Sequence, residues 1–109
     1  MKIKFLDTTL RDGSQSEGIS YSKLDKKIIS DLLIKFGIDF VECGDPFSNT
    51  KDKDFFNEYQ SDKFVAFSST RKKDCNVEDD ERLNSILNAK TTYCTIFGKS
   101  NINLVEKVL

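Results

Sequence analysis

Four short apolar runs divide the chain, at residues 3–6, 40–43, 64–67 and 93–97. Each is rich in β-branched or aromatic residues and is bounded by polar residues or glycine, which is typical of β-strands. The run 64–67 is apolar throughout, as expected of a strand that is covered on both faces. The pattern therefore predicts four strands.

The segment after the first strand and its loop has the pattern of an amphipathic helix. Ser22 and Asp25 have the spacing of a capping box, which begins a helix. Gly37 is suited to end it in the left-handed conformation. Between them runs one apolar stripe at helical spacing, formed by Ile29, Leu32, Leu33 and Phe36.

Three further helices are predicted between and after the remaining strands. The second opens near Thr50, and the third near Asn76, where the acidic residues 78–81 suit the positive end of a helix dipole. The fourth opens near Ser100. Its apolar positions are Leu104, Val105, Val108 and Leu109.

Strand and helix thus alternate four times, which predicts an α/β fold with a parallel sheet and right-handed crossovers. No linker or low-complexity segment interrupts the 109 residues, so we expect a single domain over residues 1–109. The last apolar helical pattern reaches residue 109 without a stop signal. We therefore expect the domain to be truncated at its C-terminus.

Composition narrows the class of protein. The chain carries 17 basic and 18 acidic residues, a net charge of −1, which argues against nucleic-acid binding. It has neither an apolar run of ~18 residues nor a signal peptide, so we expect no membrane association. Three cysteines at unrelated spacings indicate reduced thiols and a cytoplasmic protein.

Charged and polar residues follow the predicted strands, where parallel α/β proteins place their functional groups. Arg11 and Asp12 follow the first strand, Glu42 lies near the end of the second, and Thr70 follows the third. Carboxylates suit a hard divalent cation, and arginine can bind a carboxylate in a bidentate manner. The sequence predicts a site for a metal and an anionic substrate at this rim.

These residues lie in motifs that resemble a known family. Residues 7–15 read DTTLRDGSQ, and with residues 17–26 they resemble the opening of the isopropylmalate and homocitrate synthase superfamily. Later segments are similar to its citramalate synthase branch. They read ECGDPFSNTKD (42–52), FSSTRKK (67–73) and TIFGKS (95–100).

The resemblance implies a fold and a reaction. These proteins are (β/α)₈-barrel enzymes, so four βα units would form the N-terminal half of a TIM barrel. They condense acetyl-CoA with a 2-oxo acid, which in this branch is pyruvate, giving citramalate for isoleucine biosynthesis. A divalent metal, Mn, Mg or Zn, binds the 2-oxo acid and acts as Lewis acid and template.

The resemblance also implies roles for individual residues. By position in the motifs, Asp12 corresponds to a metal ligand. Arg11 corresponds to the arginine that holds the 2-oxo acid and stabilises the developing oxyanion, and Glu42 to an acidic catalytic residue near the substrate. Gln15 and Thr70 are expected to contact the substrate.

One departure from the family is decisive for function. The family's remaining metal ligands are a His-x-His pair late in the barrel, and this chain has no histidine. We therefore expect it to be inactive alone. The alternatives are another 2-oxo acid, a self-contained enzyme built from paired half-barrels, or a non-catalytic half-barrel.

A half-barrel also leaves two strand edges unpaired, and open edges invite pairing with another chain. We expect the chain to self-associate through these edges, to flatten into an open sheet, or both.

Overall fold

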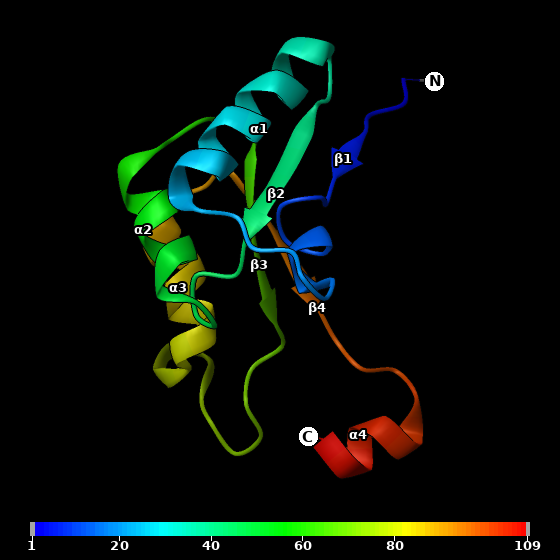
Figure 1. The fold of residues 1–109 in the computed structure, drawn as a ribbon. Coiled ribbons are helices and arrows are strands. Elements are labelled where there is room, and N and C mark those ends of the chain that lie inside the picture. Colours follow the sequence, from blue (N-terminus) through cyan, green and yellow to red (C-terminus); the bar gives the residue numbers. More distant parts are fainter. Residues whose placement is uncertain (1, 109) are drawn as a thin grey trace.

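The computed structural model describes residues 2–108 and has the predicted order of strands and helices (Figure 1). The strands are β1 (Leu6–Asp7), β2 (Phe40–Gly44), β3 (Phe64–Ser69) and β4 (Tyr93–Phe97). The helices are α1 (Lys23–Phe36), α2 (Thr50–Glu58), α3 (Glu81–Ala89) and α4 (Ile102–Val108). Two short 3₁₀ helices, η1 (Gly13–Gln15) and η2 (Val77–Asp79), lie between them. Leu109, which we assigned to the last helix, lies outside the described residues.

The four strands form one sheet in the order β1-β2-β3-β4, and every neighbouring pair is parallel. The pairing of β3 with β4 is regular, from Val65 opposite Tyr93 to Ser69 opposite Phe97. The pairing of β2 with β3 shifts between Glu42 and Gly44, which leaves Cys43 in a bulge. The predicted α/β fold with a parallel sheet is confirmed.

The sheet is curled. Strands β2 and β4 are not neighbours, yet the rings of Phe40 and Tyr93 pack edge to face with centroids 4.9 Å apart. In a flat sheet these strands would run ~9–10 Å apart, since adjacent strands are ~4.8 Å apart. Curling brings their side chains together on the concave face. The expectation of a flattened sheet was wrong, and the architecture is half of a (β/α)₈ barrel.

Helices α1, α2 and α3 cover the convex face and enclose the core (Figure 1). Phe55 of α2 is central, because its ring packs against Phe56, Tyr59 and Phe64 at centroid distances of 5.3–5.5 Å. The buried apolar residues of this core are Leu10, Val41, Cys43, Phe55, Phe56, Phe64, Ala66 and Ala89.

Both ends of α1 are formed as predicted. Ser22 accepts a hydrogen bond from the Asp25 amide, and the Asp25 carboxylate accepts one from the Ser22 amide, so the capping box is complete. Gly37 ends the helix with φ of 112°, a left-handed conformation that favours glycine.

The predicted apolar stripe of α1 is only half correct. Ile29 and Leu33 pack against the core, but Leu32 and Phe36 are 61% and 86% exposed. They belong to a second stripe at i, i+4 spacing, formed by Leu24, Ile28, Leu32 and Phe36. Helical periodicity does not say which of two apolar stripes faces the sheet. We call this second stripe the outer face of α1.

Strand β1 is shorter and later than the predicted run 3–6. Its ladder begins where the Phe5 carbonyl accepts a hydrogen bond from the Phe40 amide, while the Phe5 amide donates to the Asp39 carboxylate. Regular pairing then covers only Leu6 and Asp7. Residues 2–4 extend past the start of β2, so they have no neighbouring strand to pair with.

Helix α3 begins later than predicted. Residues 77–79 form η2, and α3 begins at Glu81, so only one of the four acidic residues lies in its first turn. Asp80 is instead the N-cap, because its carboxylate accepts hydrogen bonds from the amides of Arg82 and Leu83. It also accepts one from the Lys72 amide at 2.6 Å, which ties the preceding loop to the helix.

This cap predicts an acid-sensitive contribution to stability. The Lys72 amide, followed by the Leu83 and Arg82 amides, lowers the pKa of Asp80 from its ordinary value of 3.8. Stability from the ionised cap is therefore complete above the ordinary pKa and is lost as pH falls through the lowered one. In urea titrations, we expect Asp80→Asn to be less stable than the original chain at pH 7 and equally stable near pH 2. A constant difference across this range would contradict this role.

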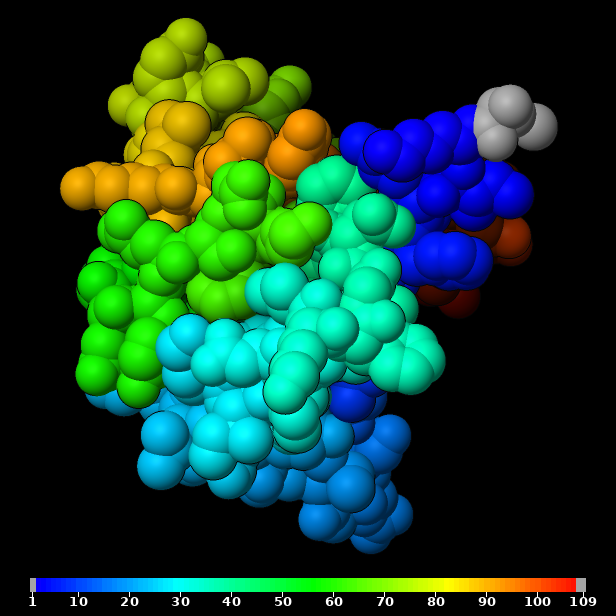
Figure 2. All heavy atoms as spheres, turned by 90° about the horizontal axis from the view of Figure 1, so that it is seen from above, coloured from blue at the N-terminus to red at the C-terminus, as the bar shows by residue number. Residues whose placement is uncertain are grey.

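The half-barrel is open on both sides. In the space-filling view the N-terminal segment forms one margin of the molecule, and α1 lies uncovered on the face shown (Figure 2). Tyr93, Ile96 and Phe97 of the other edge strand are also exposed. Within residues 2–108, no helix has both the length and the apolarity needed to cross a membrane.

Candidate functional site

The loop after β1 presents Arg11 and Asp12 from a tightly folded backbone. The amides of Arg11, Asp12 and Gly13 all donate to the Thr8 carbonyl, at 3.2, 2.8 and 3.2 Å. The Ser14 hydroxyl donates to the Arg11 carbonyl at 2.7 Å. These bonds fix the backbone from which the Arg11 side chain projects.

Arg11 and Glu42 form an ion pair on the concave face. Arg11 Nε donates to Glu42 Oε1 at 2.6 Å, and Thr95 Oγ1 donates to Glu42 Oε2 at 2.8 Å. The Glu42 side chain is 1% exposed and that of Arg11 19% exposed. Both carboxylate oxygens of Glu42 therefore have partners, which a buried carboxylate requires.

The aromatic ring of Phe67 also holds the Arg11 side chain in place. The Arg11 guanidinium carbon lies 4.0 Å from the centre of the Phe67 ring, a cation–π contact. Arg11 Nη1 lies 3.6 Å from Asp12 Oδ1. Because only Nε donates to Glu42, the terminal nitrogens of Arg11 are available for an anion at the rim.

The side chains of three of the five predicted site residues lie together in the structure, and those of the other two lie apart from them. Arg11, Asp12 and Glu42 are brought together, and Asp12 is 65% exposed. Gln15 is exposed at the end of η1. Thr70 is half-buried beyond β3, where its amide donates to the Phe97 carbonyl. The Gln15 amide donates to the Asp12 carbonyl at 3.1 Å. Among residues 2–108, no side-chain hydrogen bond or ion pair joins Gln15 or Thr70 to the other three.

Sequence reasoning missed Thr95 and Phe67. Both lie in strands that we predicted, and strand alternation puts Thr95 on the same face as Tyr93 and Phe97. A polar residue between two aromatic ones on one face was the available signal. Its partnership with Glu42 depends on the curl of the sheet, which the sequence pattern does not specify.

The described residues do not form a metal site by themselves. Within residues 2–108, no three His, Cys, Asp or Glu side chains are grouped so that they could hold a metal ion. Glu42 is occupied by Arg11 and Thr95, which leaves Asp12 as one exposed oxygen ligand at this rim. A divalent cation bound here would need further ligands.

A curled parallel sheet with helices outside and charged residues after its strands is the architecture of TIM-barrel enzymes. Comparison with known proteins agrees, because the HMGL-like family model matches residues 2–97. The chain belongs to the HMGL-like family.

Three relatives named (R)-citramalate synthase cover most of the chain. That of Aquifex aeolicus is 44% identical over 104 residues, which is 91% of this chain and 20% of that protein. That of Sulfolobus acidocaldarius is 45% identical over 103 residues, 90% of this chain and 20% of that protein. That of Synechocystis is 50% identical over 99 residues, 86% of this chain and 18% of that protein. The chain thus spans about a fifth of the length of these curated relatives.

Proposed function

We propose that this chain is the N-terminal part of an acyltransferase that condenses acetyl-CoA with pyruvate to form citramalate. The observation that carries the proposal is the Arg11 guanidinium, which Glu42 and Phe67 fix at the rim with Nη1 beside Asp12. The similarity to (R)-citramalate synthases over about nine tenths of the chain supports the choice of reaction.

In this proposal Arg11 binds the 2-oxo acid and stabilises the negative charge that develops on its former keto oxygen. A fixed donor aimed at such an oxygen lowers the barrier by about 3–4 kcal/mol. Glu42 keeps the guanidinium in place through Nε, so its role is to position Arg11. Gln15, at the end of η1, and Thr70, after β3, contact the substrates in this proposal.

We further propose that Asp12 contributes one ligand of a divalent metal, Mn, Mg or Zn. Such a metal supplies Lewis-acid polarisation of a bound 2-oxo acid. Since no three His, Cys, Asp or Glu side chains of the described residues are grouped around a metal position, we expect the 109-residue chain to be inactive without further ligands. The free thiols of Cys43, Cys75 and Cys94 favour a cytoplasmic location.

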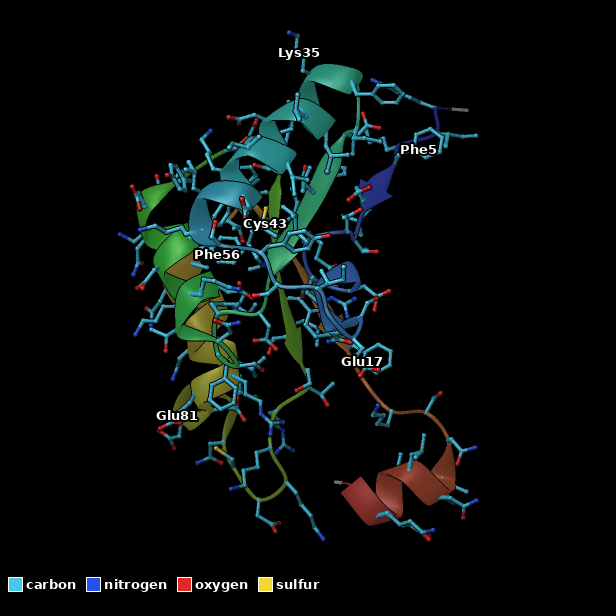
Figure 3. All side chains as sticks on the ribbon, viewed as in Figure 1. Phe5, Glu17, Lys35, Cys43, Phe56 and Glu81 are labelled. Carbon is cyan, nitrogen blue, oxygen red and sulfur yellow. The ribbon has the colours of Figure 1, made fainter. Side chains whose placement is uncertain are left out.

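A chimaera tests this function. The matching segment of the Aquifex aeolicus (R)-citramalate synthase is replaced by this chain, and CoA release from acetyl-CoA is followed with a thiol reagent in the presence of pyruvate and manganese. We expect pyruvate-dependent release. Arg11→Ala should lower kcat about 100-fold or more, and Asp12→Ala should weaken the response to manganese. Lys35→Ala, at the far end of α1 (Figure 3), is the control and should change nothing.

The same assay separates the alternatives. A folded chimaera without pyruvate-dependent release would overturn the proposal. Release that requires a longer 2-oxo acid would instead favour a 2-isopropylmalate synthase type, since the protein of that name from Oceanobacillus iheyensis is 36% identical over 80 residues. Release by the 109-residue chain alone would indicate a self-contained enzyme.

A second candidate, a non-catalytic half-barrel that self-associates, is favoured by the two open strand edges. This candidate requires self-association and no turnover, so measuring the oligomeric state of the chain tests it.

A further inference from the structure

Helix α1 carries a buried lysine that the proposed reaction does not use. Lys26 is 1% exposed, on the side of α1 that faces the sheet. Its Nζ donates hydrogen bonds to the carbonyls of Leu10, at 2.9 Å, and Cys43, at 2.5 Å. It also forms an ion pair with Asp52, whose Oδ1 lies 2.7 Å from Nζ.

The two carbonyls flank the candidate site. Leu10 directly precedes Arg11, and Cys43 directly follows Glu42. Cys43 lies in the bulge of β2, outside the regular pairing with β3, and its side chain is buried in the core (Figure 3). One ammonium group therefore joins the two backbone segments that carry the Arg11–Glu42 pair.

We propose that Lys26 is a positioning residue, which sets the distance between the loop after β1 and the end of β2 so that Arg11 meets Glu42. Lys26 touches neither side chain and acts through the two backbone carbonyls. This inference rests on the proposed function, since it assigns Lys26 to the geometry of the proposed substrate-binding arginine.

Asp52 completes the arrangement from α2. It is buried, and its Oδ2 accepts a hydrogen bond from the Asp45 amide at 3.0 Å. Gly44 leaves room for it, because a Cβ at position 44 would lie 2.3 Å from Oδ2. Asp52 also lies in the first turn of α2, where a negative charge is favourable. The ammonium is thus held by a carboxylate that cannot readily move.

A buried ion pair adds little net stability compared with apolar residues of similar volume, although removing one partner alone is strongly destabilising. Replacing both partners therefore tests the effect of Lys26 on the position of Arg11 without a large loss of fold stability. In Lys26→Met/Asp52→Leu the fold should survive, while the bonds to Leu10 and Cys43 are lost.

The readout is the Nε–H of Arg11 in proton–nitrogen correlation spectra, which requires no substrate. The chain has three arginines, Arg11, Arg71 and Arg82, so the signals are few and the other two serve as internal references. In the original chain the Arg11 Nε–H donates to a buried carboxylate and should exchange slowly with water. In the double variant we expect its exchange to accelerate about tenfold or more, with backbone signals of β3 and α3 unchanged.

Two further variants complete the test. Lys27→Met is the matched control, because Lys27 is the next residue and pairs with Asp31 at the surface. Asp52→Asn keeps Lys26 and both carbonyl bonds, so it should leave the exchange of Arg11 within about twofold. If the double variant does not fold, the exchange rate of the Arg11 Nε–H in Asp52→Asn is the deciding measurement. Faster exchange in that variant would overturn the proposal.

Slow Arg11 exchange in a folded double variant would also overturn it. The two proposals can fail separately. If the chimaera is inactive but the Arg11 Nε–H still exchanges slowly only when Lys26 is present, the proposed reaction is contradicted and the role of Lys26 is not.

Discussion

Replacing Arg11 with methionine is expected to lower the free energy of unfolding by about 3 kcal/mol or more. The reason lies in Glu42, which is 1% exposed and would be left with Thr95 as its remaining hydrogen-bond partner. The cost is therefore the burial of an uncompensated carboxylate. Urea titration followed by circular dichroism measures it.

Two companion variants establish that the charge is responsible. Glu42→Gln should cost less, about 1–2 kcal/mol, because Arg11 is partly exposed and can be hydrated. Arg11→Met/Glu42→Gln should be more stable than Arg11→Met alone, since the second change removes the stranded charge. An Arg11→Met variant as stable as the original chain would contradict the buried ion pair.

The second large effect concerns assembly: we expect the 109-residue chain to form a dimer in which two half-barrels close on each other. All four strands are parallel in the order β1 to β4, so one twofold rotation about the barrel axis brings β4 of each copy beside β1 of the other. We expect this dimer to cover the outer face of α1, whose Leu24, Ile28, Leu32 and Phe36 are exposed in the single chain. Each open strand edge then has another strand beside it.

Sedimentation equilibrium at micromolar concentration tests this assembly. Leu32→Glu, in the outer face of α1, should weaken dimerisation about 100-fold or more, because the dimer buries the new charge twice. Asn57→Glu is the matched control, with the same change of charge on α2, which has α1 and α3 as its neighbours. A monomeric chain that binds no dye for exposed apolar surface would contradict self-association.

The sequence predicted most of the fold because the strands and helices have strong local signals. The alternation of apolar runs and helical stripes gave the parallel sheet, and the capping box at Ser22 gave the start of α1. The errors arose where partners far along the chain decide the outcome. Residues 3 and 4 have β propensity without a strand beside them. Asp80, which caps α3, is also bound by the distant Lys72 amide.

The candidate site was accessible to the sequence only in part. Motifs pointed to Arg11, Asp12 and Glu42, and the structure brings these together. Thr95 and Lys26 were missed for a common reason: a threonine in a strand and a lysine in a helix are ordinary at the surface. Burial and curvature give them their partners, and neither can be deduced from local periodicity.

The contacts that hold Glu42 in place also imply an order of assembly. Lys26 is 16 and 17 residues from the carbonyls it joins, Arg11 is 31 residues from Glu42, and Thr95 is 53 residues from it. Shorter loops close at a lower entropic cost, so the lysine contacts can form within the first β–α–β unit. The second oxygen of Glu42 gains its partner only when β4 docks. Because β4 is an open edge, we expect the Thr95 contact to form after the lysine contacts during folding and to be lost when that edge frays.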